Sequence, residues 1–280
     1  MNDDRVGHEE LPKGIPGGPG IAGERPRDLG GVGSAADVTR DDYLQGALRL
    51  WQPAQGLRAN VDTVLLGAFA RARGGDRVLD LGCASGAVAL HLAWRFPRMA
   101  ALGVDIQEHL VALAKRNARE NGFEERVSFV VGDLRHPGSV CAPESFDVVV
   151  TNPPYGDVTL SRPSPSLQAA VARHDLCCSL AQMARAAAFA LRSGGHLYAV
   201  FRAGRIAELL AALRHCRLEP KRLVPVYPKT GKDASVILVG AVKGARPGAC
   251  LEAPVFIQGE EGGFTPLLLR AYTREGLSCR

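Results

Sequence analysis

The feature that most constrains the fold of this chain is a regular alternation of short apolar runs with amphipathic segments. Arg77 to Leu81, Ala100 to Asp105 and Val127 to Val131 are compact and largely apolar, which is typical of strands buried on both faces. The segments after the first two, Gly86 to Arg95 and Glu108 to Asn121, carry apolar residues at helical spacing. Such alternation predicts a doubly wound α/β sheet of mostly parallel strands, whose ligands bind at the carboxyl ends of the strands.

The alternation continues toward the C-terminus. The later elements that we expect are a strand from Phe146 to Thr151, a helix from His174 to Arg192, a strand from His196 to Phe201, a helix from Gly204 to Cys216, and strands from Arg222 to Tyr227 and from Ala234 to Val242. A short connection separates the last two strands, which predicts an antiparallel hairpin at the edge of the sheet. The sheet is thus predicted to have seven strands.

Composition divides the chain near residue 36. Residues 1–36 hold nine Gly and four Pro and lack a hydrophobic period, so we expect a disordered leader there. The remainder, 37–280, is predicted to be one domain. Its parts are an N-terminal hairpin and helix (37–75), the core sheet (76–242) and a C-terminal extension (243–280). In the first part, the hairpin is expected at Tyr43 to Leu50 and the helix at Val61 to Arg73.

Charge and cysteine content narrow the function classes. The formal net charge is +5, and residues 192–246 hold eleven Lys or Arg against three Asp or Glu, a local net of +8. This segment is as typical of a solvated face as of a surface that follows nucleic-acid phosphates. The seven cysteines have no metal-ligand spacing, so we expect reduced cytoplasmic thiols and no metal site. No uninterrupted apolar run approaches the roughly 20 residues that cross a bilayer, so we also expect no membrane span.

A glycine-rich turn joins the first predicted strand to its helix. It reads Asp80-Leu81-Gly82-Cys83-Ala84-Ser85-Gly86, and its small residues allow a close approach of the backbone to a ligand. Asp105, at the end of the next strand, can accept two hydrogen bonds from a ribose diol. Asp133 ends the third strand, where its carboxylate can accept from an adenine amino group. Each acid alone is also typical of an exposed loop, so the prediction depends on the three together.

Two cofactor classes share this pattern. A nicotinamide dinucleotide fingerprint begins with Gly, whereas this turn begins with Asp80, whose carboxylate would repel a pyrophosphate. The same carboxylate attracts the ammonium group of a methionine moiety. The turn therefore favours S-adenosylmethionine.

The most specific motif is Asn152-Pro153-Pro154-Tyr155, directly after the fourth strand. Consecutive prolines fix φ and remove backbone donors, which leaves carbonyl groups in a rigid arrangement. The Asn supplies a side-chain oxygen and the Tyr a flat face for stacking. Together they can accept both hydrogens of a planar NH2 group and direct its nitrogen lone pair toward a methyl donor.

With these residues the chain resembles the class I, S-adenosylmethionine-dependent methyltransferases of the NPPY amino-methylating group. The resemblance spans about Asp42 to Tyr272. Within that group it is similar to bacterial enzymes that methylate adenine N6 beside the anticodon of a valine tRNA. The stretches that carry this narrower likeness are Gln52 to Arg58 with Asp62, Ala172 to Asp175, Phe201 to Arg205, and Pro254 to Tyr272.

The resemblance implies a role for each site residue. The implied cofactor-binding residues are Asp80, Gly82, Ala84, Gly86, Asp105, Ile106, Asp133, Leu134 and Asn152, and the implied catalytic residues are Asn152, Pro153, Pro154 and Tyr155. Ala84 stands where the motif often has Gly, which would narrow the methionine end of the site. Asp175 stands where Glu is more usual.

The site does not by itself choose a substrate, because adenine N6, guanine N2 and a glutamine amide all present a planar NH2 group. The glutamine-methylating relatives carry an N-terminal helical domain, and DNA adenine methyltransferases carry a target-recognition domain; neither is evident here. RNA, with adenosine 37 of a tRNA as target, is therefore the leading hypothesis. Arg202 and Arg205 are the expected phosphate contacts, with an ion pair to Glu208 as the alternative for either, and Arg162 lies in a loop that we expect to close over a flipped base. Ribosomal RNA, a protein glutamine, a small molecule and a non-catalytic binder remain alternatives, and the oligomeric state stays open.

Overall fold

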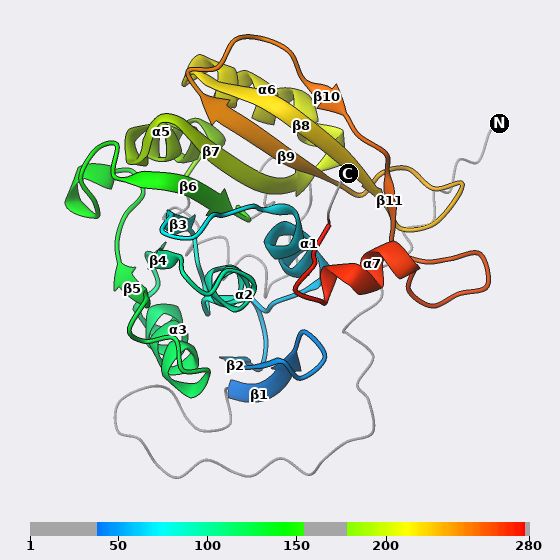
Figure 1. Ribbon diagram of the computed structural model, residues 1–280, viewed down its shortest axis with the longest axis horizontal. Coiled ribbons are helices and arrows are strands. Elements are labelled where there is room, and N and C mark those ends of the chain that lie inside the picture. The colour runs from blue at the N-terminus through cyan, green and yellow to red at the C-terminus, as the bar shows by residue number, and fades with distance from the viewer. Residues whose placement is uncertain (1–37, 154–177, 278–280) are drawn as a thin grey trace, which may run out of the picture.

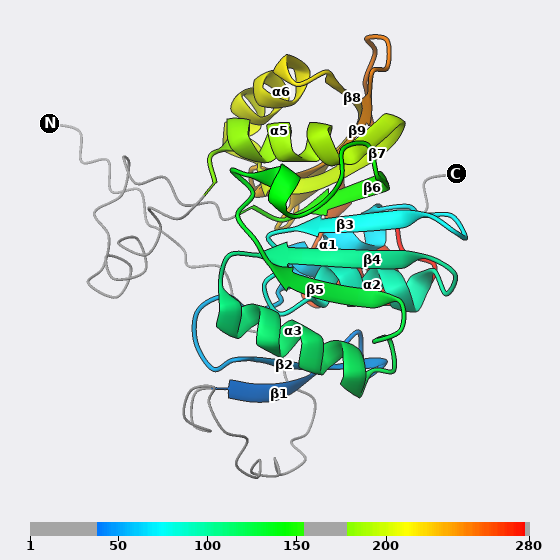
Figure 2. The ribbon, with the colours of Figure 1, turned by 90° about the vertical axis from the view of Figure 1, so that its left-hand side faces the viewer.

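A computed structural model describes residues 38–153 and 178–277. Their centre is a nine-stranded sheet that carries helices on both faces (Figures 1 and 2). Its strands, in order across the sheet, are β10 (Cys250–Leu251), β8 (Leu218–Tyr227), β9 (Val236–Lys243), β7 (Leu191–Arg202), β6 (Phe146–Thr151), β3 (Arg77–Leu81), β4 (Ala100–Asp105) and β5 (Val127–Val131), and β11 (Val255–Phe256) also pairs with β8. The leader at 1–36 and the expected start of a helix at His174 lie outside the described residues.

The strand directions confirm the predicted fold class. β5, β4, β3, β6 and β7 run parallel to one another, and β9 pairs antiparallel with both β7 and β8. The antiparallel hairpin is therefore β8–β9, with β9 inserted between β7 and β8. The seven predicted strands are all present. The additional strands β10 and β11 have two residues each, too few to produce a detectable alternation in the sequence.

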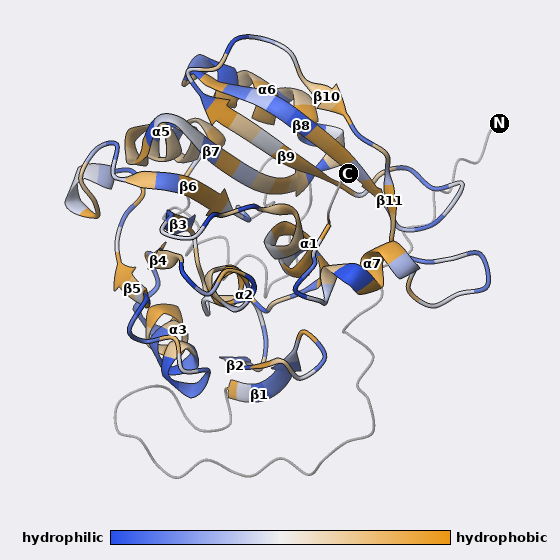
Figure 3. Ribbon diagram, in the orientation of Figure 1, coloured by the Kyte–Doolittle hydropathy of each residue, from blue (hydrophilic) through white to orange (hydrophobic). Residues whose placement is uncertain are grey.

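Helices cover the sheet in two layers, each with its own apolar core. The helices are α1 (Val61–Phe69), α2 (Ala87–Arg95), α3 (Glu108–Glu120), α5 (Leu180–Ala190), α6 (Ile206–His215) and α7 (Pro266–Ala271), with 3-10 turns η1 (Pro137–Ser139) and η3 (Ala203–Arg205). Val78 on β3 packs in the core formed with α1, α2, α3 and α7, whereas the next residue, Leu79, packs in the core formed with α5 and α6. Figure 3 shows the resulting apolar central strands and the hydrophilic outer side of α3.

Two predicted helix ends are wrong. α1 ends at Phe69 rather than Arg73, because Ala70 has an extended backbone. α5 ends at Ala190 rather than Arg192, because Leu191 pairs with Phe146 and begins β7. In both places the sequence continues with good helix formers, and tertiary contacts decide the boundary.

The predicted N-terminal hairpin is present as a separate antiparallel pair, β1 (Val38–Tyr43) and β2 (Leu48–Pro53). It is fixed to α3 by Asn117, whose side chain accepts from the N–H of Trp51 at 2.6 Å and donates to its carbonyl at 2.9 Å. The guanidinium of Arg116 lies 3.5 Å from the centroid of the Trp51 ring. These contacts place the hairpin at the β5 side of the sheet. Within the described ranges, no helix is long and apolar enough to cross a membrane.

Candidate active site

The carboxyl ends of β3, β4, β5 and β6 surround one cavity. Of the residues predicted for the site, those that line it are Asp80, Gly82, Ala84, Asp105, Ile106, Asp133, Leu134, Asn152 and Pro153. Three others, Pro154, Tyr155 and Arg162, lie outside the described residues. Sequence positions more than 70 residues apart thus meet at the edge of the sheet where a doubly wound fold binds its ligands.

The glycine-rich turn has a left-handed backbone at three positions. Gly82, Ala84 and Gly86 have φ of +75°, +45° and +85°. A Cβ atom at Gly82 would meet no atom within 4 Å, so this glycine faces open space on the cavity side. At Gly86 a Cβ would come within 2.6 Å of Cζ of Phe129. Gly86 therefore stands behind the wall of the cavity, where it lets α2 begin close to β5.

Substitution of these two glycines should separate their roles. We expect Gly86→Ala to lower the free energy of unfolding by about 2–4 kcal/mol, since left-handed strain and overpacking add. Gly82→Ala, the matched control, carries the strain without the clash and should lose about 1–2 kcal/mol. Chemical denaturation of both variants measures the difference. Equal losses would contradict a steric role for Gly86.

Asp80 is buried in the floor of the cavity, with 1% of its surface exposed. Its Oδ2 accepts a hydrogen bond from the N–H of Ala89 at 3.2 Å. Burial raises the pKa of Asp80 to about 7; the Ala89 hydrogen bond opposes this shift and the nearby charge of Asp105 adds to it. A buried carboxylate held this way is poised to receive a cation.

Asp105 and Asp133 are oriented by local hydrogen bonds. In Asp105, Oδ2 accepts from the N–H of Ala84 and Oδ1 from the N–H of Gln107, both at 2.9 Å. Each oxygen keeps a second lone pair with which to accept from a ligand hydroxyl. Asp133 instead accepts from the side chain of Arg135, at 2.8 Å from Nε and 2.6 Å from Nη2. These hydrogen bonds lower the pKa of Asp133 and keep it ionised.

Two further parts of the cavity wall come from the segment before α1 and from the region around the start of α5. Arg58 lines one of them and is held by Asp41 at 2.7 Å and by the carbonyl of Pro53 at 2.6 Å. The acidic partner of Arg58 lies on β1, the first strand of the N-terminal hairpin. Cys178 and Met183 form another part of the lining. Neither belongs to a motif, and only the packing of α5 brings them to the site.

The end of β6 brings the amine-orienting residues to the same cavity. Thr151 is buried, and its hydroxyl donates to the carbonyl of Leu81 at 3.0 Å, which ties β6 to β3. Asn152 and Pro153 follow and line the opening. The geometry therefore combines a buried carboxylate, an oriented carboxylate and a polar amide around one space.

The predicted phosphate contacts lie outside this cavity. Arg202 ends β7, the strand next to β6, and Arg205 ends the 3-10 turn that follows. Arg205 pairs with Glu208 through Nε at 3.0 Å and Nη2 at 2.7 Å, as the sequence spacing allowed. Both arginines remain at the carboxyl edge of the sheet.

Known proteins resemble a large part of this chain. A family model described as a methyltransferase domain matches residues 72–210. A tRNA1(Val) (adenine(37)-N6)-methyltransferase of Bacteroides thetaiotaomicron is 30% identical over 191 residues, which cover 68% of this chain and 78% of that protein. The chain belongs to the class I methyltransferases.

Other relatives support the fold and the broader activity of this methyltransferase. A crystal structure of a predicted O-methyltransferase from Agrobacterium tumefaciens superimposes with a TM-score of 0.66 at 23% identity, and covers 78% of this chain and 99% of that one. A release factor glutamine methyltransferase of Rhodospirillum rubrum is 41% identical over 99 residues, which cover 35% of this chain and 29% of that protein. The second likeness is therefore confined to a minor part of each protein.

The cofactor of this methyltransferase is S-adenosylmethionine, as its family membership shows. The donor set fits that molecule. Asp80 offers a buried negative charge, Asp105 offers acceptors for a pair of hydroxyls, and Gly82 leaves open space beside the backbone. The charge of Asp80 can hold a positive ammonium group, and the acceptors of Asp105 can hold a ribose. The open space at Gly82 lets the cofactor approach the backbone closely.

Proposed function

We propose that this enzyme transfers a methyl group to the exocyclic N6 amine of an adenine in RNA, with adenosine 37 of a tRNA as the target. The observation that carries the proposal is that Asn152 and Pro153 open onto the same cavity as Asp80 and Asp105. An amine held by the amide of Asn152 would thus face a methyl donor held by the two carboxylates.

The proposed roles of the residues follow from their chemistry. Asp80 holds the ammonium group of the cofactor, and Asp105 holds its ribose hydroxyls. Asp133 would accept from the adenine amino group of the cofactor, and Ile106 and Leu134, which line the same part of the cavity, would offer apolar contacts to the adenine. Gly82 and Ala84, which line the cavity, would hold the methionine moiety, and Gly86 supports that turn from behind.

Catalysis is then mainly positional. When bound, the cofactor supplies an electrophilic methyl group on a sulfonium centre. The Asn152 amide oxygen and the Pro153 carbonyl accept the two amine hydrogens, so that the nitrogen lone pair points at the methyl carbon. We assign Pro154 to rigidity and Tyr155 to stacking on the target base. The proton released on methylation passes to solvent, so no strong base is needed.

RNA is favoured over a protein substrate because the similarity to a tRNA-methylating relative extends over more of the chain than the similarity to a glutamine-methylating relative. The tRNA-methylating relative matches 68% of this chain, whereas the glutamine-methylating relative matches 35%. Arg202 and Arg205 at the carboxyl edge are the proposed phosphate contacts, and Arg162 is the proposed contact to the target nucleotide. Methylation of tRNA would place the enzyme in the cytoplasm. A glutamine amide in a release factor is the second candidate, on the strength of the local identity.

Methyl transfer from labelled S-adenosylmethionine separates these substrates. We expect unmodified bulk tRNA to become labelled and N6-methyladenosine to appear on nucleoside mass spectrometry. Unmodified ribosomal RNA and an unmethylated release factor, tested in parallel, should remain unlabelled. Labelling of the release factor alone would assign the enzyme to glutamine, and N2-methylguanosine in the ribosomal RNA would assign it to guanine.

A further inference from the structure

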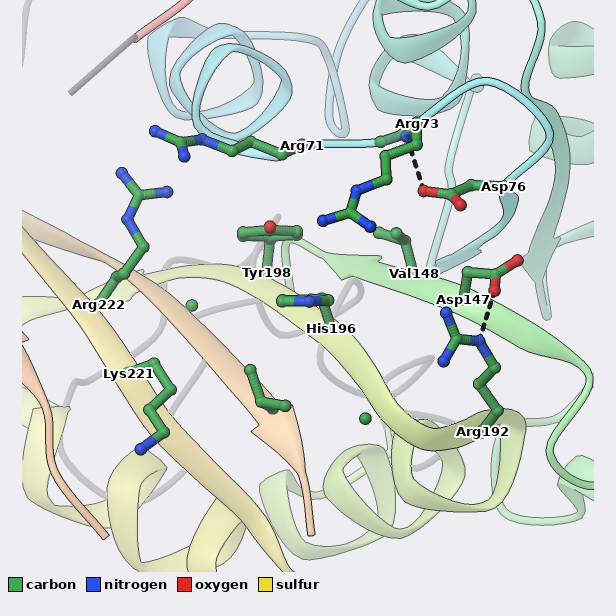
Figure 4. Close-up of a pocket in the computed structure, with 14 residues that line it drawn as sticks. Arg71, Arg73, Asp76, Asp147, Val148, Arg192, His196, Tyr198, Lys221 and Arg222 are labelled. Carbon is green, nitrogen blue, oxygen red and sulfur yellow. Dashed lines mark hydrogen bonds and ion pairs between the residues drawn. The ribbon is translucent and has the colours of Figure 1, made fainter. Parts of the chain in front are cut away.

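A second cavity lies at the opposite edge of the sheet, by the amino ends of β3 and β6 (Figure 4). Its volume is about 480 Å³, within the range of small-molecule sites. Asp76 and Asp147 mark its position, because each stands at or just before the start of a strand whose far end reaches the cofactor cavity. A five-residue strand such as β3 spans about 17 Å, so the two cavities are separate.

The floor of this cavity is built by strand register. Gly240 on β9 pairs with Tyr198 on β7 and with Arg222 on β8. Gly240 lines the cavity, and a Cβ atom there would lie 3.4 Å from Cβ of Arg222 and 3.5 Å from Cε1 of Tyr198, so a larger side chain at this position would intrude between these neighbours. Tyr198 stacks on His196 with ring centroids 6.1 Å apart and an interplanar angle of 8°. The Tyr198 ring is buried, whereas His196 is exposed and lines the cavity beside it.

The rim of the cavity is positively charged. Five cationic residues line it, Arg71, Arg73, Arg192, Lys221 and Arg222, against the two carboxylates of Asp76 and Asp147. Arg192 contacts Asp147 at 2.5 Å, and Arg222 pairs with Glu252 outside the lining. Five cationic side chains thus face three carboxylates when Glu252 is included, and the net charge around the cavity is positive.

Arg73 is the cation best placed to act on a ligand. It follows α1, is exposed, and in Figure 4 extends toward His196. Its backbone N–H donates to Asp76 at 2.6 Å, which fixes the main chain and leaves the guanidinium to the cavity. Partial burial lowers the pKa of His196, and Arg73 and Arg192 lower it further, so this ring stays neutral among cations.

We propose that this cavity binds the phosphate group of a nucleotide, with the base against the His196 ring. Guanidinium groups pair with phosphate oxygens, and flat aromatic surfaces stack on bases. The phosphate comes either from the RNA substrate or from a free mononucleotide. If the phosphate belongs to RNA, the inference rests on the proposed function, because the bound RNA would then be the substrate that is methylated at the other edge of the sheet. If the phosphate belongs to a free mononucleotide, the inference does not depend on the proposed function.

Two variants of the full-length chain test the site. Arg73→Gln removes the guanidinium and keeps the backbone contact to Asp76. Gly240→Val fills the floor without changing charge, and a melting curve shows whether it folds. Arg119→Gln is the matched control, an exposed arginine in the last turn of α3.

The first arm titrates AMP by calorimetry, and the second measures the binding of fluorescein-labelled bulk tRNA across salt concentrations. We expect AMP affinity to fall at least fivefold in Arg73→Gln and to be unchanged in Arg119→Gln. If RNA is the source, tRNA affinity also falls about fivefold or more, and the slope of log K against log salt decreases by about one. A loss confined to AMP supports the site with a free nucleotide as ligand.

Unchanged binding of both probes in Arg73→Gln, relative to Arg119→Gln, would overturn the proposal. The AMP arm is independent of methyl transfer, so a failure to methylate tRNA would not be confused with a failure of this site. Gly240→Val confirms that the loss follows from the cavity: if folded, it should weaken AMP binding as much as Arg73→Gln. Undiminished AMP binding in a folded Gly240→Val protein would also contradict the proposal.

Discussion

Asp80→Asn is expected to weaken cofactor binding strongly and, at the same time, to make the folded protein more stable above pH 7. In the free protein burial raises the pKa of the Asp80 carboxyl to about 7, from an ordinary value of 3.8. An acid whose pKa is raised by folding costs stability when it ionises. The loss of unfolding free energy is absent below about pH 4. It grows as the pH rises from about 4 to about 7, and it is complete above about pH 7.

The size of the effect follows from the shift. A difference of about three pKa units corresponds to about 4 kcal/mol as an upper bound. Asparagine keeps a side-chain oxygen to accept from the N–H of Ala89, so the helix contact survives. The lost charge, however, is the one that attracts the ammonium group, and we expect the affinity for S-adenosylmethionine to fall at least about a hundredfold.

Denaturation at pH 5 and pH 8.5, with calorimetric titration of the cofactor, measures both consequences. The gain in unfolding free energy should be larger at pH 8.5 than at pH 5. In the wild-type enzyme the cofactor affinity should rise with pH up to about 7, as Asp80 ionises. Asp42→Asn is the control, since the side chain of Asp42 is 73% exposed, and it should change neither quantity. A pH-independent gain, or intact binding, would be inconsistent with this role of Asp80.

The buried centre of the fold was the most predictable part of the chain. The bounds of β3, β4 and β6 agree with the sequence, because strands covered on both faces are continuous apolar runs. The start of β7 was not predictable, since Leu191 has no local signal for a strand and extends through its pairing with Phe146. Local pattern specifies an element where burial is complete, and pairing specifies it elsewhere.

The same distinction applies to the sites. Asp80 and Asp105 could be predicted because strand ends in a doubly wound sheet meet at one edge. Arg135 and Met183 could not, because nothing in their neighbourhood in the sequence indicates a ligand. The second cavity depends on the register that aligns Tyr198, Gly240 and Arg222 across three strands. Such a row exists only after the sheet has formed.

Asn152→Ala should lower the rate of methyl transfer by about 100- to 1,000-fold while the protein stays folded, by analogy with the loss of a single oriented hydrogen-bond partner at a reacting group. Asn152 is half-buried at the end of β6, outside the apolar cores, so truncation should change stability little. The measurement is kcat at saturating tRNA and S-adenosylmethionine, with cofactor affinity from calorimetry.

A second substitution distinguishes orientation of the amine from a merely structural role. Asn152→Asp keeps an acceptor oxygen at the same position, so it should retain more activity than Asn152→Ala even though it adds a charge. Because Asn152 also lines the cofactor cavity, the affinity for S-adenosylmethionine can change, but by less than about fivefold in the alanine variant, far less than kcat. If kcat of Asn152→Ala stayed within tenfold of the wild type, the amide would not be orienting the amine. That result would contradict the role that we propose for the Asn152-Pro153-Pro154-Tyr155 motif.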